Sequence, residues 1–294
     1  MSLSILSLAL SILACALALA VGWKARKAHR GLWAIFESHR KEVAAGEVEE
    51  RRLWQRCYGR LLALRHGRNK PIMLTAQHAE DVFLADYFEG QETGFFVEIG
   101  AYDGIQFSNT YAMEQMGWTG VLVEAHPDNA EKCRRNRTRS VVVHAAIGAP
   151  EASGTSTTFH MVGGRGADLL SAVSPDEDHL RRCRREGEGI RAVQVPCLGL
   201  GQLLHTHPLP RIDFLSIDIE GGEIDALRGL DFEQMRPRLI LLEANNSAAR
   251  AALLDFLEPR GYRPLRSFGV NTLFEDQRAV SRPSSGAFPC ELLS

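Results

Sequence analysis

Residues 95–104 read FFVEIGAYDG, and this stretch decides the fold. Five residues that are apolar except for Glu98 predict a buried β-strand, and Gly100 and Gly104 predict a tight turn directly after it. Glycine lets the backbone of such a turn approach a ligand, and an acidic side chain can bind the charged or hydroxylated parts of a nucleoside. A glycine-rich turn after a strand is as often only a turn, so the interpretation depends on the segments that follow.

A second apolar strand, residues 120–124, ends in Glu124 twenty residues after Gly104. A carboxylate at this spacing can accept hydrogen bonds from both ribose hydroxyls of a bound nucleotide. A dinucleotide site would need G-x-G-x-x-G to seat a pyrophosphate, whereas the third residue after Gly100 is Asp103. The Asp103 carboxylate would repel a pyrophosphate, but it suits the cationic sulfonium and the ammonium group of S-adenosylmethionine. A nicotinamide-dependent oxidoreductase is therefore disfavoured.

Residues 212–230 read IDFLSIDIEGGEIDALRGL. Asp218 and Glu220 lie at the carboxyl end of an apolar strand, where open α/β sheets bind ligands, and Glu243 ends the next strand. Packing does not readily explain carboxylates there. We expect Asp218 to orient or deprotonate an acceptor, with Glu220 and Glu243 as supporting carboxylates. The three acids are chemically able to hold a hard metal ion, but carboxylates at strand ends have other roles, and no metal is predicted.

Four motifs together resemble the FkbM methyltransferase family. They are FFVEIGAYDGIQFSNT, GWTGVLVEAHP, FLSIDIEGGEIDALRGL and LILLEANN, which occur in the family's order within residues 76–275. The resemblance implies a class I methyltransferase with a Rossmann-like α/β sheet, S-adenosylmethionine as the donor, and O-methylation of a hydroxyl on a small molecule or sugar. Within this resemblance we assign a cofactor site to Glu98, Gly100, Ala101, Asp103, Gly104, Asn109, Glu124 and Ala146.

Short apolar runs separated by helical segments predict a mostly parallel sheet. The expected strands are residues 95–99, 120–124, 140–147, 212–217 and 239–243, followed by a helix at 248–257. Runs at 262–268 and 270–274 around Gly269 predict a C-terminal antiparallel hairpin. Residues 149–193 form a polar insertion, expected to be either a lid or substrate-facing segment or a decorated surface with one helix.

Residues 2–23 contain no charged side chain, and a helix of that length can cross a bilayer. A cleavable signal peptide is the alternative, because Ala18-Leu19-Ala20 resembles a cleavage site, but no Lys or Arg precedes the apolar run. The segment is followed at once by Lys24, Arg26, Lys27 and Arg30, which predict that the catalytic domain faces the cytosol. The sequence thus predicts a single-pass membrane protein.

Residues 24–70 carry 13 Lys and Arg against five acidic residues, and apolar side chains recur in them at helical spacing. We expect a basic amphipathic stalk helix that lies on anionic lipid or packs, solvated, on the catalytic domain. The domain organisation is then a membrane anchor (1–23), a stalk (24–70) and a methyltransferase domain (71–294).

Further features narrow the function. The six cysteines show neither paired nor metal-type spacing, which favours thiols in a reducing compartment. The basic residues lie beside the membrane segment and outside any recognisable nucleic-acid module, so no nucleic-acid partner is expected. Among the histidines, His160 and His179 in the insertion are the most interesting alternative bases. A catalytically inactive, membrane-anchored interaction protein with a methyltransferase fold is the alternative function.

Overall fold

The computed structural model describes residues 48–164, 170–173, 175, 177–205 and 211–280. The chain divides into two compact units, Met1–Tyr87 and Phe88–Ser294. The predicted membrane anchor and the first part of the predicted stalk lie outside the described residues. Among the helices of the described part, none combines the length and apolarity that a bilayer span requires. The anchor and the domain boundaries at residues 23 and 70 therefore stay predictions.

The first unit contains α3 (Val48–Arg65) and α4 (Glu80–Tyr87). The buried Tyr58 hydroxyl of α3 donates a hydrogen bond to Asp86 of α4. Gly59 of α3 packs so closely on the following segment that a Cβ there would lie 1.9 Å from the carbonyl oxygen of Ile72. The second half of the predicted stalk is therefore a helix that packs within its own unit.

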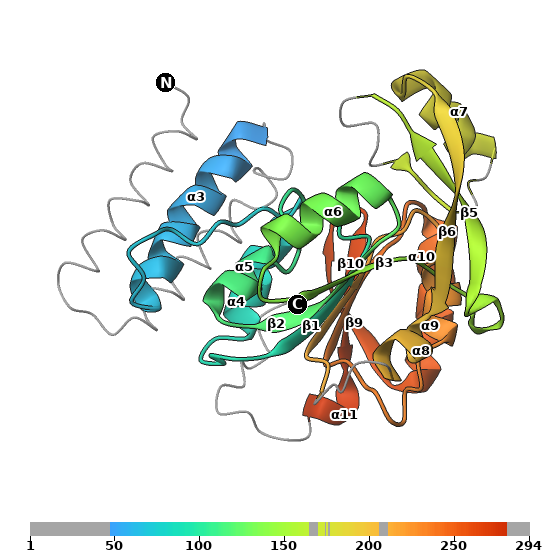
Figure 1. The fold of residues 1–294 in the computed structure, drawn as a ribbon. Coiled ribbons are helices and arrows are strands. Elements are labelled where there is room, and N and C mark those ends of the chain that lie inside the picture. The colour runs from blue at the N-terminus through green and yellow to red at the C-terminus, as the bar shows by residue number, and fades with distance from the viewer. Residues whose placement is uncertain (1–47, 165–169, 174, 176, 206–210, 281–294) are drawn as a thin grey trace. The chain divides into compact units, whose positions relative to one another are not determined.

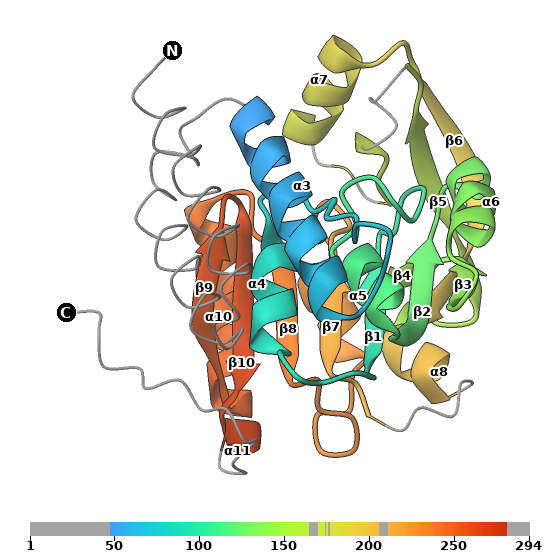
Figure 2. The ribbon, with the colours of Figure 1, turned by 90° about the vertical axis from the view of Figure 1, so that its left-hand side faces the viewer.

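The second unit is built on a seven-stranded sheet with the order β3-β2-β1-β7-β8-β10-β9 (Figures 1 and 2). The first five strands in this order pair in parallel, while β10 pairs antiparallel with β8 and β9. The strands are β1 (Phe95–Ile99), β2 (Thr119–Glu124), β3 (Val141–His144), β7 (Phe214–Ile217), β8 (Leu239–Glu243), β9 (Tyr262–Phe268) and β10 (Asn271–Asp276). The predicted mostly parallel sheet and its C-terminal hairpin are confirmed.

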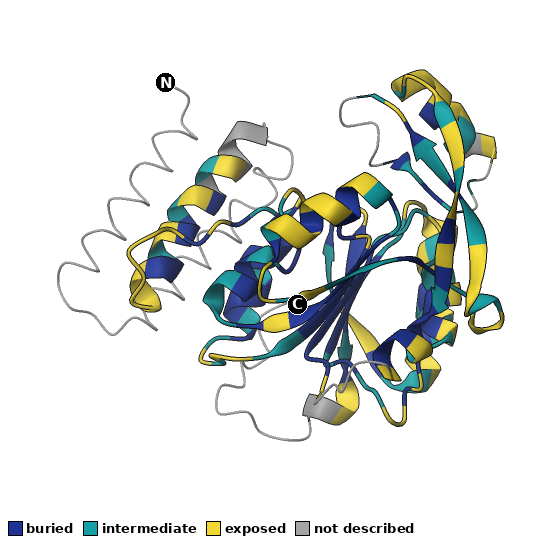
Figure 3. Cartoon of the chain, in the orientation of Figure 1, coloured by how far each residue is buried: buried dark blue, intermediate teal, exposed yellow. Residues whose placement is uncertain are grey.

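Helices cover both faces of this sheet (Figure 1). One face packs on α5 (Tyr111–Met116) and α6 (Pro127–Asn136), and the other on α8 (Leu200–His205), α9 (Glu223–Arg228) and α10 (Ser247–Leu257). The chain also contains short helices η1 (Pro150–Ala152), η3 (Glu258–Arg260) and α11 (Gln277–Val280). Figure 3 shows the result: the central strands are buried, and exposed residues lie on the outer faces of the helices.

The register of the strands places apolar side chains on one face of the large sheet and polar side chains at the carboxyl end of the other face. Ile99, Val123, Ile217 and Leu242 share the core with α8, α9 and α10. Residues paired in register place their side chains on the same face, and side chains alternate along a strand. Glu98 pairs with Leu122 and Ser216, Ser216 pairs with Leu241, and Asn271 pairs with Glu243. The carboxyl end of the other face is therefore polar, with Glu98, Glu124, Ser216, Glu243 and Asn271 on it.

One prediction about the middle of the chain was wrong, and the insertion has strands that were not predicted. The expected strand 140–147 is interrupted at Ala145, and β4 (Ala146–Gly148) leaves the large sheet to join a second one with the order β4-β6-β5. The insertion contains β5 (Thr155–Val162), α7 (Glu177–Glu186) and β6 (Ile190–Gly199), so it is more than a surface with one helix. Its strands are half exposed and polar, and continuous apolar runs therefore do not mark them.

Candidate active site

The sheet changes direction between β1 and β7, where β2 and β3 lie to one side and β8 to the other. Ligands in open α/β sheets bind at such a switch point, outside the carboxyl ends of the strands. The loops that leave β1 and β7 touch each other there. The Asp218 amide donates to the Ile99 carbonyl at 3.0 Å, and a Cβ on Gly100 would lie 1.8 Å from the Asp218 carbonyl oxygen. Only glycine at position 100 lets the two strand ends meet.

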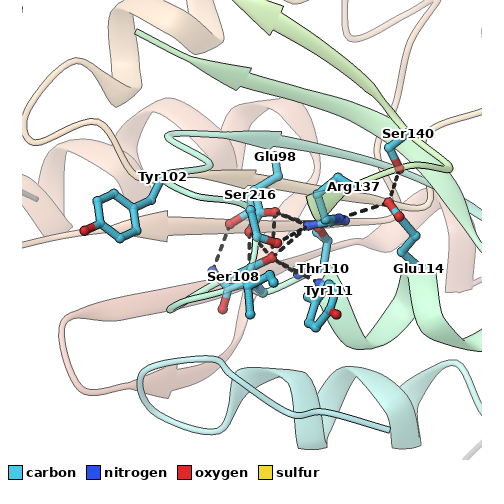
Figure 4. A network of polar contacts seen from close by, with 12 residues as sticks. Glu98, Tyr102, Ser108, Thr110, Tyr111, Glu114, Arg137, Ser140 and Ser216 are labelled. Carbon is cyan, nitrogen blue, oxygen red and sulfur yellow. Dashed lines mark hydrogen bonds and ion pairs between the residues drawn. The ribbon is translucent and has the colours of Figure 1, made fainter. Parts of the chain in front are cut away.

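The Glu98 carboxylate lies beneath the loop that follows β1 (Figure 4). It is buried and accepts hydrogen bonds from the Ser108 hydroxyl at 2.9 Å, the Asn109 amide at 2.8 Å and the Thr110 hydroxyl at 2.6 Å. Both of its oxygens are therefore bonded within the protein. Glu98 fixes the path of the loop, and its assignment to direct cofactor contact stays a prediction.

Arg137, just after α6, was missed by the sequence analysis. Its side chain is fully buried and lies 3.4 Å from Glu98 and 2.9 Å from Glu114. It also donates to the Gly104 carbonyl at 3.0 Å and to the Thr110 hydroxyl at 2.9 Å. A buried guanidinium with two carboxylates and several acceptors is a well-compensated charge cluster. Arg137 stands in no local motif, because its partners are brought to it only by the fold.

The remaining residues of the β1 loop are held in place by the backbone around them. Asp103 accepts hydrogen bonds from the amides of Ile105 and Gln106, each at 2.8 Å, and so shapes the turn. Ala101 is buried, and its amide donates to the Val123 carbonyl at 3.1 Å. A Cβ on Gly104 would lie 2.7 Å from the Arg137 side chain, so Gly104 is needed for packing.

Glu124 ends β2 beside this loop. One carboxylate oxygen accepts the Tyr102 amide and the other the His126 amide, each at 2.7 Å. The Ala145 amide donates to the Glu124 carbonyl at 3.2 Å, so Ala146 follows immediately beyond the end of β2. The structure thus brings seven of the eight predicted cofactor residues onto β1, its loop and the end of β2, with Ala146 at the neighbouring strand β4.

Asn109 carries an unsatisfied polar atom at the switch point. Its side chain is buried, and its Nδ2 donates to the Ser216 hydroxyl on β7 at 3.2 Å. Its Oδ1 has no hydrogen-bond partner among the described residues. Buried polar atoms in folded proteins are nearly always bonded, so this oxygen is a position where a ligand or a water can supply the donor.

The predicted catalytic acids Asp218, Glu220 and Glu243 lie at the ends of the neighbouring strands β7 and β8. Burial, followed by the negative charges of Asp218 and Glu220, raises the pKa of Glu243 to about 9. Its Oε2 is buried and has no hydrogen-bond partner in the described part of the chain. Burial and the neighbouring carboxylates thus favour the protonated form of Glu243, which can donate a hydrogen bond.

Helix α7 of the insertion meets these acids through His179. His179 Nδ1 lies 3.7 Å from Glu220, and its Nε2 lies 2.8 Å from the Leu170 carbonyl, to which it can donate. Burial raises the pKa of Glu220, and the charges of His179 and Arg182 oppose that shift. The insertion thus contacts the β7 loop. His160, the other histidine of interest, lies on β5, where its backbone pairs with Ala172.

No group of three or more His, Cys, Asp or Glu side chains among the described residues is arranged to hold a metal ion. The cysteines that the structure describes, Cys57, Cys133, Cys183 and Cys197, are free thiols.

A family model, the methyltransferase FkbM domain, matches residues 98–264. This span contains both strand ends of the switch point and every predicted site residue. The chain belongs to the FkbM methyltransferase family. The family resemblance stated from the motifs is thereby confirmed, and S-adenosylmethionine is the methyl donor.

No curated protein matches this FkbM methyltransferase. Among solved structures it is similar to a putative RNA methyltransferase from Pyrococcus horikoshii, with 11% identity, a TM-score of 0.37, and 68% of this chain and 82% of that chain covered. It is also similar to an O-methyltransferase from Bacillus cereus in complex with SAH, with 14% identity, a TM-score of 0.35, and 72% of this chain and 86% of that chain covered. A third similar structure is a TehB-like SAM-dependent methyltransferase from Corynebacterium glutamicum, with 10% identity, a TM-score of 0.35, and 82% of this chain and 100% of that chain covered. All three TM-scores are below 0.5, and none bears on the acceptor.

The switch point of this FkbM methyltransferase fits its cofactor chemically. S-adenosylmethionine carries a positive sulfonium, an ammonium group and ribose hydroxyls, all of which pair with anionic or neutral oxygen acceptors. The structure offers the Glu124 carboxylate and the unpartnered, buried Asn109 Oδ1 there. No described group of the site requires a different ligand.

Proposed function

We propose that this FkbM methyltransferase methylates a hydroxyl oxygen of a small molecule or sugar. The observation that carries the proposal is the position of Asp218 at the switch point, where its amide is hydrogen-bonded to the end of β1, while burial and nearby acids favour the protonated form of Glu243 on the neighbouring strand. An alcohol is a poor nucleophile while it keeps its proton, so a carboxylate at this place matches the chemistry of a hydroxyl acceptor.

We assign the cofactor to the β1 and β2 half of the switch point. Glu124 would bind the ribose hydroxyls, Asn109 Oδ1 would accept from the ammonium group, and Gly100 and Ala101 would let the backbone approach. When bound, S-adenosylmethionine supplies a methyl group on a sulfur that leaves as a neutral sulfide. The protein's main task is then to align the acceptor and to remove its proton.

The acids on β7 and β8 take different roles in this proposal. The Asp218 carboxylate accepts the hydroxyl proton as the new oxygen–carbon bond forms. Protonated Glu243 donates a hydrogen bond to another oxygen of the acceptor. Glu220, tied to His179, holds the insertion beside the acceptor. A small molecule with several hydroxyls, such as a sugar, offers both the donor and the acceptor groups that this set requires.

The first experiment is calorimetric titration of the full chain with S-adenosylmethionine, S-adenosylhomocysteine and NAD. Binding of the first two and not of NAD supports the proposal, and a search for acceptors among hydroxylated metabolites with labelled S-adenosylmethionine follows. A folded chain that binds neither sulfur compound would favour the inactive interaction protein instead. Labelling that occurs only on nitrogen or carbon acceptors would contradict O-methylation.

We also propose that residues 1–23 anchor the protein and that the catalytic domain faces the cytosol. The uncharged length of this segment and the basic residues after it support the proposal. The full chain should then stay in membranes during carbonate extraction. Glycosylation of a sequon introduced into the catalytic domain would overturn the orientation.

A further inference from the structure

Tyr102 adopts a backbone conformation that large side chains avoid. Its φ is +51°, within the left-handed region, and the only other non-glycine residues of the described chain with positive φ are Ala79, Phe107 and Glu220. Three of these four follow β1 or β7, at the switch point. A bulky residue with positive φ is uncommon, and such strain tends to be kept where it serves a function.

Tyr102 occupies the position that the second glycine has in a G-x-G turn. In G-x-G turns, the second glycine has no side chain, which lets the backbone approach the ligand. Tyr102 stands two residues after Gly100, where that glycine would be. The chain therefore keeps a conformation that glycine would adopt without strain, yet places an aromatic ring there.

The contacts of Tyr102 fix its place beside Glu124. Its amide donates to the Glu124 carboxylate at 2.7 Å, and the preceding Ala101 amide donates to the end of β2. The Ser108 and Thr110 side chains of the loop turn inward, toward Glu98 and Arg137, whereas the Tyr102 ring points away from that network (Figure 4). The ring is only partly buried by the protein.

We propose that the Tyr102 ring binds the nucleoside half of S-adenosylmethionine, next to the ribose site at Glu124. An aromatic ring offers a flat surface to a purine or to the face of a ribose, a contact that glycine or asparagine cannot replace. The proposal rests on the proposed function, since it takes Glu124 as the ribose ligand. It explains why tyrosine is retained in spite of its backbone conformation.

The test uses the full chain with Tyr102→Asn and Tyr102→Phe, S-adenosylhomocysteine and adenosine as probes, and two measurements, melting temperature and calorimetric Kd. Asparagine tolerates positive φ, so Tyr102→Asn should raise the melting temperature of the ligand-free protein by about 2–4 °C. The same variant should weaken binding of both probes about tenfold. Tyr102→Phe keeps the ring and should bind as the parent does.

Ala79→Gly is the matched control, because Ala79 also has positive φ and belongs to the first unit. It should raise the melting temperature and leave both Kd values unchanged. Parental affinity in Tyr102→Asn overturns the proposal, and so does weaker binding of S-adenosylhomocysteine with unchanged binding of adenosine. If Glu124→Ala and Tyr102→Asn both bind as the parent does, the proposed ribose site is wrong as well; if only Glu124→Ala weakens binding, the Tyr102 proposal alone fails.

Discussion

Two groups of acidic side chains lie on or beside the same sheet, and they differ in what neutralises them. Glu98 and Glu114 are buried around the fully buried guanidinium of Arg137, and both are hydrogen-bonded by the surrounding protein. Asp218 and Glu243 lie at the ends of β7 and β8, where Glu243 has an unbonded oxygen and a raised pKa. A carboxylate paired with a buried cation stabilises the fold, whereas a buried carboxyl group with an unbonded oxygen is available to a ligand.

The largest effect is expected from Arg137→Met. Removing one partner of a buried charge cluster leaves Glu98 and Glu114 uncompensated, which typically costs about 3–5 kcal/mol of unfolding free energy. Chemical denaturation measures this loss. Arg228→Met is the control, since Arg228 also contacts two acids, Asp225 and Glu151, but is 45% exposed; it should lose far less stability than Arg137→Met, because solvent screens exposed ion pairs. Equal losses of unfolding free energy in the two variants would contradict the prediction that the buried Arg137 cluster stabilises the fold more than an exposed group of ion pairs does.

Asp218→Asn should lower turnover by about 100-fold or more, once an acceptor has been found. Asparagine keeps the size and hydrogen bonding of Asp218 but cannot take a proton. The Kd for S-adenosylhomocysteine should change by no more than a few fold. Normal turnover would move the base to Glu220 or to a histidine of the insertion, and loss of cofactor binding would place Asp218 in the donor site.

Glu124→Ala should weaken cofactor binding by more than about 1 kcal/mol, because the ribose hydroxyls lose charge-assisted hydrogen bonds. The variant also frees the amides of Tyr102 and His126, so its fold must be checked by circular dichroism and melting. Unchanged affinity in a folded variant would remove Glu124 from the site.

The smallest effect at neutral pH is expected from Glu243→Gln, which imitates the protonated acid. The unfolded chain releases the Glu243 proton near pH 4.5, whereas the folded protein holds it to about pH 9. The folded state therefore binds more protons between these values, and this group makes the parent less stable as pH rises through that window. Glu243→Gln removes that contribution.

Denaturation at pH 5.5 and pH 8.5 measures the difference. The parent should lose more stability between the two pH values than Glu243→Gln does. Burial also raises the pKa of Asp81, to about 7. Asp81 therefore lowers the stability of both proteins in the same way as pH rises, and its contribution cancels in the comparison. Identical slopes would mean that Glu243 is ionised in the folded protein, so that it would compete with Asp218 as a base.

The strands of the large sheet could be predicted because each is apolar and buried. The bounds of β1, β8 and β9 agree with the sequence prediction, since a continuous apolar run ends where the strand does. β5 and β6 could not be found in this way, because they form a small, half-exposed sheet rich in polar residues. Strand pairing, which decides their existence, is not a local property.

The same limit applies to the site. Glu98 and Glu124 look alike in the sequence, because each is an acid at or next to the end of an apolar run. Glu98 becomes a structural residue only because Arg137, 39 positions later, lies beside it. The pKa of Glu243 likewise depends on its burial and on the acids that follow β7. Sequence reasoning found the residue types at the strand ends, and the fold divides their roles.

The insertion leaves and re-enters the domain at one place. Gly148 of β4 lies beside Gly199 of β6 in a parallel pair, so the segment 149–198, which includes β5, α7 and most of β6, begins and ends at neighbouring positions. The segment between them can change in length or sequence while the large sheet keeps its register, since loops with fixed, adjacent ends tolerate insertions at little energetic cost. Because the proposed function places this segment beside the acceptor, we expect that exchanging it between related enzymes changes the acceptor and leaves the donor site intact.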